Sequence, residues 1–258
     1  ESTLPYAEHF HASFSLGLIL DGRTCLTLGE KQYIVEKGDM VLIPPGLPHR
    51  CNPIGPSTRS YHMAHIDANW FYSHVCPALG FNENALVRVG TPVIRAPALF
   101  AKALAIIDTV GTDSTATGEQ LIAFFSAIQQ HSRIFEANAK IPAHPVAVLI
   151  EKAYLAEEMA TELRLTDGPY TITGLAKAGN VRRETFSRAF RREVGMSPSV
   201  YLHCLRLEHG RQMLRQGKSI AEAAAASGYV DQSHFHRMFV RYYSVTPGCY
   251  RKNRSHPY

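Results

Sequence analysis

Two stretches of the chain repeat one pattern and decide the fold of its C-terminal part. Residues 174–198 read GLAKAGNVRRETFSRAFRREVGMSP, and residues 223–247 read AAAASGYVDQSHFHRMFVRYYSVTP. Each stretch has small apolar residues, a turn near Gly179 or Gly228, and then two phenylalanines four residues apart. That spacing places both rings on one face of a helix. The pattern predicts an internal repeat of about fifty residues with a helix-turn-helix in each copy.

The face opposite the phenylalanines is polar in both copies. It carries the side-chain types that read base edges or hold phosphates in DNA. These residues are Arg182, Arg183, Glu184, Thr185, Ser187, Arg188, Arg191 and Arg192 in the first copy, and Asp231, Gln232, Ser233, His234, His236, Arg237 and Arg241 in the second. One such face can be merely solvated. Two copies, each with a glycine turn before the helix, favour double-stranded DNA as the partner.

The distribution of charge agrees with a nucleic-acid partner. The 258 residues include 27 Lys and Arg and 22 Asp and Glu, for a formal net charge of +5. From Tyr170 onward there are 15 basic and 5 acidic residues, so the net charge of this part is +10. A basic surface can also bind membranes, but these charges lie on predicted compact helices without an exposed apolar face. We therefore expect DNA and no membrane.

These residues resemble the DNA-binding part of the AraC/XylS family of bacterial transcription regulators. The resemblance covers residues 146–254 and rests on SRAFRREVGMSP, RLEHGRQML and SGYVDQSHFHRMFVRYYSVTPGCYR, in that order along the chain. Three departures stand out. Ala223-Ala224 replaces Ile-Ala, Ser244 replaces a glycine, and Gly210 replaces an alanine. A glycine inside a helix costs up to about 1 kcal/mol of stability.

The helices of this domain are predicted from the same patterns. We expect a first helix over residues 146–160, then an N-cap at Thr171 for a helix over residues 172–178. A recognition helix follows from about Arg183, and a helix over residues 199–216 joins the two copies. Eighteen helical residues span about 27 Å. This length suits two recognition helices in successive major grooves, which lie about 34 Å apart.

The N-terminal part reads as short strands and turns. Strands are expected at residues 14–20, 25–28, 32–35, 40–43 and 61–66, with turns at Asp21-Gly22, Gly29-Glu30 and Lys37-Gly38-Asp39. Short, regularly spaced strands predict a β-barrel or jelly roll. Two helices, at residues 97–110 and 117–139, follow. The prolines Pro142 and Pro145 then break the helical pattern and mark a domain boundary, so we expect domains at residues 1–140 and 141–258. The fold class is therefore α+β in two domains, with the second domain all-α.

The stretch at residues 38–52, GDMVLIPPGLPHRCN, is similar to the second cupin motif, and His9-Phe10-His11 resembles the HxH of the first motif. These resemblances imply a cupin-type sensor domain of the kind found in many AraC-family proteins. His9 and His11 share a strand face, and His49 can close over them. Three imidazoles can hold zinc or iron.

Cupin metal sites usually add a glutamate a few residues after HxH, and here Ala12, Ser13, Phe14, Ser15 and Leu16 follow. We therefore expect His9, His11 and His49 to contact a small-molecule effector, with no metal and no cofactor. Histidines that only cap the barrel mouth are the alternative.

The predicted function is a ligand-responsive, sequence-specific transcription regulator that is not an enzyme. The family resemblance favours an activator, and it implies a homodimer because such helices often pair between subunits; packing within one chain is the alternative. Two other functions stay open: a metal-dependent cupin enzyme fused to a DNA-binding domain, and a constitutive DNA-binding protein whose barrel only dimerises. Five scattered cysteines favour a reducing compartment, which we take to be the cytoplasm.

Overall fold

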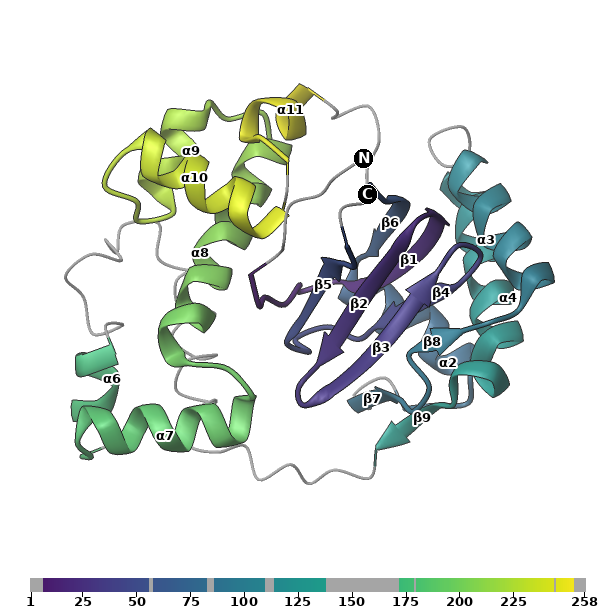
Figure 1. The fold of residues 1–258 in the computed structure, drawn as a ribbon, viewed down its shortest axis with the longest axis horizontal. Helices are drawn as coiled ribbons and strands as arrows, with labels where there is room; N and C mark the ends of the chain where they lie inside the picture. The colour runs from purple at the N-terminus through teal and green to yellow at the C-terminus, as the bar shows by residue number, and fades with distance from the viewer. Residues whose placement is uncertain are drawn as a thin grey trace. The chain divides into compact units, whose positions relative to one another are not determined.

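The computed structural model describes residues 7–55, 58–82, 86–109, 114–137, 172–178, 180–243 and 245–252. The chain forms two compact units, of which the first includes Phe10–Asn138 and the second includes Ala139–Asn253 (Figure 1). Several predictions concern other residues. The helix over residues 146–160, the cap at Thr171, the prolines Pro142 and Pro145, the turn at Gly179 and the departure at Ser244 all lie outside the described residues.

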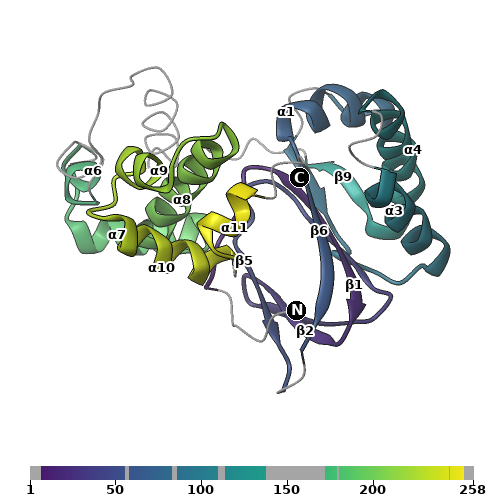
Figure 2. The ribbon, with the colours of Figure 1, turned by 90° about the horizontal axis from the view of Figure 1, so that it is seen from above.

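The first unit is built on short strands, as the apolar segments and turns predict. The strands are β1 (Phe14–Asp21), β2 (Arg23–Leu28), β3 (Lys31–Glu36), β4 (Met40–Ile43), β5 (His49–Pro53), β6 (Ser60–Ile66), β7 (Leu86–Val89), β8 (Val93–Ile94) and β9 (Ile134–Ala137). One sheet has the strand order β6-β1-β4-β8, another has the order β3-β2-β5, and β7 pairs with β9. Figure 2 shows the two larger sheets facing one another, with β5 on one side and β6 on the other.

Strand β1 contributes to two cores, because successive side chains of a strand point to opposite faces. Phe14, Leu16 and Leu18 pack on the side of the sheet that the helices cover. Ile19 packs between the two sheets, in a cluster that includes Leu26 of β2. The antiparallel register with β6 sets polar residues opposite one another on the inner face, where Ser15 pairs with His65. The alternation along β1 thus separates an apolar outer layer from an interior with polar groups.

Helices cover the outer face of the sheet that contains β1. They are α1 (Ala68–Trp70), the π-helix η1 (Phe71–Val75), α2 (Cys76–Ala78), α3 (Pro97–Thr109) and α4 (Ser114–Ser132). Phe71 stacks on Phe14 at a centroid distance of 4.4 Å, and Phe125 of α4 meets both rings edge-on. Figure 2 shows α3 and α4 side by side on this face. The two predicted helices after residue 96 are confirmed, with one correction.

The prediction that the second of these helices continues to residue 139 is wrong. Helix α4 ends at Ser132, because Arg133 adopts a left-handed backbone conformation with φ of 49°. The next residues form β9, in which Ile134 pairs with Val89 and Phe135 pairs with Arg88 of β7. A strand partner about 45 residues away in sequence therefore overrides the local helical pattern.

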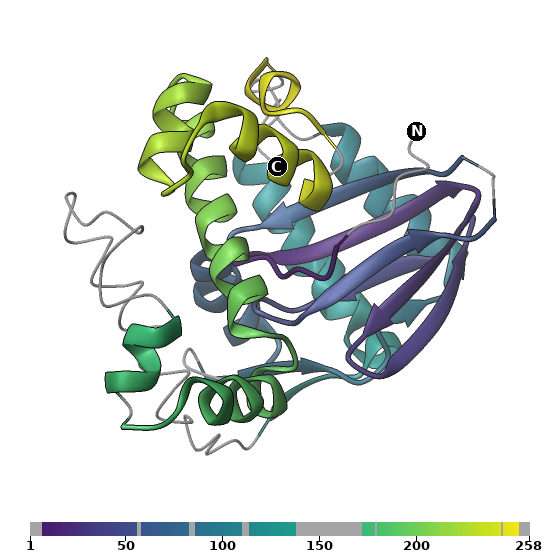
Figure 3. The ribbon, with the colours of Figure 1, turned by 60° about the vertical axis from the view of Figure 1, so that its left-hand side comes forward.

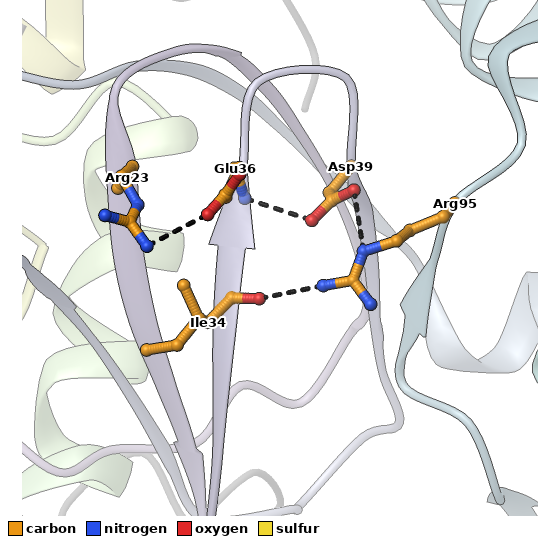
Figure 4. A network of polar contacts seen from close by, with 5 residues as sticks. All are labelled: Arg23, Ile34, Glu36, Asp39 and Arg95. Atoms are coloured by element: carbon orange, nitrogen blue, oxygen red, sulfur yellow. Dashed lines mark hydrogen bonds and ion pairs between the residues drawn. The ribbon is translucent and has the colours of Figure 1, made fainter.

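Polar contacts hold the β3–β4 corner, where the predicted Lys37-Gly38-Asp39 turn forms (Figure 4). Gly38 has a φ of 89°, a conformation that glycine adopts without strain. The Asp39 carboxylate accepts a hydrogen bond from the Glu36 N–H at 3.0 Å and pairs with Arg95 at 3.3 Å. Arg95 also donates to the carbonyl of Ile34 at 3.0 Å. These contacts tie the two sheets to the segment that leads from β8 into α3.

The second unit is all-α, as predicted. Its helices are α6 (Ile172–Ala178), α7 (Arg183–Val194), α8 (Pro198–Arg215), α9 (Ile220–Ala226), α10 (Gln232–Tyr243) and α11 (Pro247–Lys252). Figure 3 shows α8 as the long helix between the α6–α7 pair and the α9–α10 pair. Sequence patterns account for the ends: Gly195 stops α7 with a φ of 87°, and Ser197 caps α8 with Pro198 in its first turn.

Gly210 has a packing role that the sequence comparison with the family does not suggest. A Cβ at this position would lie 2.5 Å from Cε2 of Phe235 and 2.8 Å from Oγ of Ser227. Glycine therefore lets α8 approach α9 and α10 closely. Glycine lowers the stability of helix α8, but alanine at position 210 would collide with the Phe235 ring, which fixes α10 in place.

Candidate nucleic-acid interface and effector site

Helix α7 presents its predicted DNA-contacting face to solvent. Phe186 and Phe190 are buried in a cluster with Leu175 of α6, and Phe190 meets Tyr201 of α8 edge-on at 5.3 Å. The opposite face is open. Arg182, Arg183, Glu184, Thr185, Arg188, Arg191 and Arg192 are exposed, and Ser187 is half-buried. The apolar contacts thus fix the orientation of α7 and leave the polar side chains accessible.

Helix α10 repeats this arrangement in the second helix-turn-helix. Phe235 and Phe239 are fully buried. Asp231, Gln232, Ser233, His236, Arg237 and Arg241 are exposed, and His234 is half-buried. Arg188 and Arg237 take the same position in the two copies, two residues after the buried Phe186 and Phe235.

Two residues of the α10 face have local structural roles. The Asp231 carboxylate accepts a hydrogen bond from the His234 N–H at 2.6 Å, so Asp231 is the N-cap of α10. The His234 ring meets the Tyr229 ring edge-on at 5.2 Å. The side chain at the corresponding cap of α7, Arg182, makes no capping hydrogen bond. Asp231 and His234 therefore help to shape the start of the recognition helix, a role that the pattern of polar residues alone does not reveal.

A buried ion pair lies inside the second unit, and the sequence patterns did not predict it. Arg211 donates to Glu208 at 2.6 Å, and both side chains are about 95% buried. Burial lowers the pKa of Arg211, but Glu208 and the nearby Tyr243 and Tyr250 outweigh it and hold the pKa above its usual value. Opposite charges three residues apart in a helix are common on surfaces, so only the packing of α8 identifies this pair as part of the core.

The structure places the three predicted effector residues in two units. His11 and His49 lie in the first unit, where both are buried and their ring centroids are 5.2 Å apart, whereas His9 is grouped with the second unit. The prediction that His9 and His11 share a strand face is wrong, because the first strand, β1, begins only at Phe14. Neutral imidazole is a good ligand for a transition metal such as zinc.

The tautomers of two of these histidines follow from their hydrogen bonds. Nδ1 of His9 lies 2.7 Å from the carbonyl of Ala7, and Nδ1 of His49 lies 2.8 Å from the carbonyl of Leu47. A carbonyl oxygen only accepts, so Nδ1 carries the proton in each ring and Nε2 of the neutral ring is an acceptor. Burial lowers the pKa of His9 to about 4, against a smaller opposing effect of the Ala7 carbonyl. His9 is therefore neutral near pH 7.

A fourth histidine extends the cluster. His65 of β6 meets His11 edge-on at a centroid distance of 4.5 Å, and His11 lies 5.2 Å from His49. Nδ1 of His65 is within hydrogen-bonding distance of the Ser13 and Ser15 hydroxyls, at 3.2 and 3.1 Å. The signal for this residue was available in the sequence, because strand alternation puts His62 and His65 on opposite faces and only one can point inward.

A buried cation also lies in the first unit. Arg59 is 2% exposed, and it donates to the Thr24 hydroxyl while its guanidinium lies 5.6 Å from the centre of the Tyr61 ring. Burial raises the pKa of the nearby Cys51 thiol to about 12, and the charge of Arg59 opposes this effect. The sequence did not predict the burial of Arg59, because an isolated arginine before a strand is usually at the surface.

Among the described residues, no helix has the length and apolar character needed to cross a membrane.

Comparisons with known proteins agree with both units. A family model described as AraC-like ligand binding domain matches residues 3–137, and a helix-turn-helix domain model matches residues 175–253. The chain is 24% identical over 250 residues to the HTH-type transcriptional regulator YbfI of Bacillus subtilis, across 89% of this chain and 81% of the relative. It is 22% identical over 254 residues to the HTH-type transcriptional activator RhaR of Yersinia pseudotuberculosis, across 96% of this chain and 85% of the relative.

The fold is similar to that of a solved structure. Apo ToxT from Vibrio cholerae superposes with a TM-score of 0.64 at 13% identity, across 97% of this chain and 93% of that chain. The likeness supports a sheet-rich N-terminal part followed by a helical C-terminal part. The ligand-binding family model covers more than half of the chain, and the helix-turn-helix model covers the repeat. The chain therefore belongs to the AraC family of transcriptional regulators, with an N-terminal ligand-binding domain and a C-terminal helix-turn-helix domain that binds DNA.

Proposed function

We propose that α7 and α10 each enter a major groove of promoter DNA and that their polar faces bind it. The observation that carries this proposal is the repeated arrangement of buried phenylalanines behind an exposed polar face. Helix α8 has 18 residues and a length of about 27 Å. This is compatible with two recognition helices on successive grooves, about 34 Å apart on one side of the duplex. One chain would then contact two adjacent segments of a promoter.

Arg188→Ala and Arg237→Ala are each expected to weaken binding to a specific duplex more than binding to a random duplex. A bidentate contact between arginine and guanine contributes about 1–3 kcal/mol of discrimination. The measurement is fluorescence anisotropy of the full chain with a duplex enriched from a random pool and with a scrambled duplex. Arg215→Ala is the matched control, because Arg215 is exposed at the end of α8. An equal loss on both duplexes would identify a phosphate contact, and no loss on either would contradict the docking.

We propose further that the effector binds the ligand-binding domain beside His9, His11 and His49 without a metal. Nδ1 of His9 and Nδ1 of His49 each donate to a backbone carbonyl, and burial keeps His9 neutral, so Nε2 of His9 is an acceptor. An effector that meets Nε2 of His9 must therefore offer an O–H or N–H donor. This requirement favours a hydroxyl-bearing metabolite over a carboxylate beside His9. Such a partner also supplies the hydrogen bond that a buried imidazole needs.

His49→Ala is expected to abolish the thermal stabilisation that a hydroxyl-bearing metabolite gives to the full chain. A thermal-shift screen with sugars and sugar alcohols on one plate and simple carboxylates on another measures this. His62→Ala is the control, because His62 is an exposed histidine on β6. The same samples are analysed for bound metal by mass spectrometry. A stoichiometric metal whose removal abolishes the shift would overturn the metal-free proposal, and an unchanged shift in His49→Ala would remove His49 from the site.

The remaining features of the function are also proposals. The relative RhaR is named an activator, and we propose that this protein also activates transcription. A promoter–reporter fusion in cells that lack the regulator tests this.

We propose a homodimer that pairs through α3 and α4, and a light-scattering mass equal to that of one chain would contradict it. The proposed domain boundary, between residues 140 and 141, is tested by limited proteolysis.

Promoter DNA of bacteria lies in the cytoplasm, so we propose that the regulator works there. We also propose that it has no enzymatic activity.

A further inference from the structure

The two helix-turn-helix units differ by one residue in the turn. Helices α6 and α9 begin at Ile172 and Ile220, which are 48 positions apart. Recognition helices α7 and α10 begin at Arg183 and Gln232, which are 49 positions apart. The second turn is therefore one residue longer than the first.

Backbone geometry identifies the additional residue. Asn180 and Gly228 both take a left-handed conformation, with φ of 52° and 70°. The next N–H donates to a carbonyl five residues back in each turn: Val181 to Ala176, and Tyr229 to Ala224, both at 3.0 Å. Val181 thus corresponds to Tyr229. The caps Arg182 and Asp231 also correspond, which leaves Val230 as the residue that only the second turn has.

Val230 contributes almost nothing to the packing of its own unit. It is 85% exposed, compared with 41% for Val181. An apolar residue just before an N-cap often packs on the fourth residue of the helix. Here that residue is Phe235, which is fully buried and is covered by Tyr229 at a ring distance of 5.3 Å. Tyr229 therefore takes the packing role, and the Val230 side chain points to solvent at the start of the recognition helix.

We propose that Val230 contacts the C5-methyl group of a thymine in the major groove. Its neighbours Gln232 and Ser233 are exposed polar residues of the first turn of α10, and in a helix-turn-helix this end of the recognition helix faces the base edges. The methyl group of thymine is the apolar group that a major groove offers to such a side chain. Val230 would then add a preference for T·A at one position of the site. This inference rests on the proposed docking of α10.

The test uses the full chain and a duplex enriched from a random pool by the wild-type protein. Each thymine of the α10 half-site is replaced in turn by deoxyuridine, which removes only the methyl group. One replacement is expected to weaken wild-type binding about fourfold, the effect of losing one methyl-sized apolar contact. Val230→Ala is expected to bind the thymine and deoxyuridine duplexes equally. If every replacement affects Val230→Ala and wild type to the same extent, the proposal is wrong.

Two further variants separate this failure from a failure of docking. Val181→Ala is the matched control in the first turn and is expected to keep the wild-type response to deoxyuridine in the α10 half-site. Arg237→Ala reports whether α10 binds the duplex at all. If Arg237→Ala weakens binding but Val230→Ala responds like wild type, α10 docks and Val230 does not read thymine. If neither Arg237→Ala nor Val230→Ala changes the affinity for the duplex, the proposed docking of α10 is wrong. Unchanged melting temperatures of both valine variants are expected, because neither valine is buried.

Discussion

Arg211→Ala is expected to destabilise the helix-turn-helix domain by about 3–5 kcal/mol, the usual cost of removing one partner of a buried ion pair. Arg211 and Glu208 are both about 95% buried and lie 2.6 Å apart. The variant leaves the Glu208 charge in the core without its partner. Burial and Glu208 raise the pKa of Tyr243, and Arg211 lowers it. The variant removes this opposing positive charge. Urea unfolding followed by circular dichroism measures the free energy of unfolding.

The control for this prediction lies on the same helix. Arg215→Ala removes an exposed arginine one turn further along α8 and is expected to change the stability by less than about 0.5 kcal/mol. Replacing Glu208 and Arg211 together by methionine should restore much of the lost stability, because two apolar side chains leave no buried charge. If Arg211→Ala and Arg215→Ala unfold at the same urea concentration, the ion pair does not stabilise the domain.

The secondary structure was largely readable from local patterns, because most elements bury one regular face. The alternation around Phe14 and Leu16 indicates β1, and the four-residue spacing of Phe235 and Phe239 indicates α10. The end of α4 was not readable. Residues 134–137 leave the helix to pair with β7, and pairing with a strand so distant in sequence leaves no local signal.

The candidate sites show the same division between local and distant information. Exposure of the polar faces of α7 and α10 follows from helix periodicity, and the approach of His49 to His11 was expected from motif spacing. The burial of Arg59, the contact of His65 with Ser13 and Ser15, and the need for glycine at position 210 depend on elements far apart in sequence.

Specific binding of the full chain to DNA is expected to fall steeply with salt. Exposed arginines of α7, α10 and the α7 cap are Arg182, Arg183, Arg188, Arg191, Arg192, Arg237 and Arg241. If Arg188 and Arg237 read bases, the other five arginines are expected to contact phosphates. Five phosphate contacts release enough counterions for a slope of about −4 to −5 in a plot of log K against log salt. Between 50 and 200 mM salt, the affinity per chain should then drop by about 500-fold.

Anisotropy titrations at several salt concentrations give this slope, and single variants test its origin. Arg191→Gln is expected to weaken specific and random duplexes alike and to make the slope shallower by about 1, because one phosphate contact is lost. Arg188→Ala should instead lower discrimination between the two duplexes. Arg95→Gln in the ligand-binding domain is the control and should leave the slope unchanged. A wild-type affinity that is equal at 50 and 200 mM salt would mean that the basic faces of α7 and α10 do not contact the phosphate backbone.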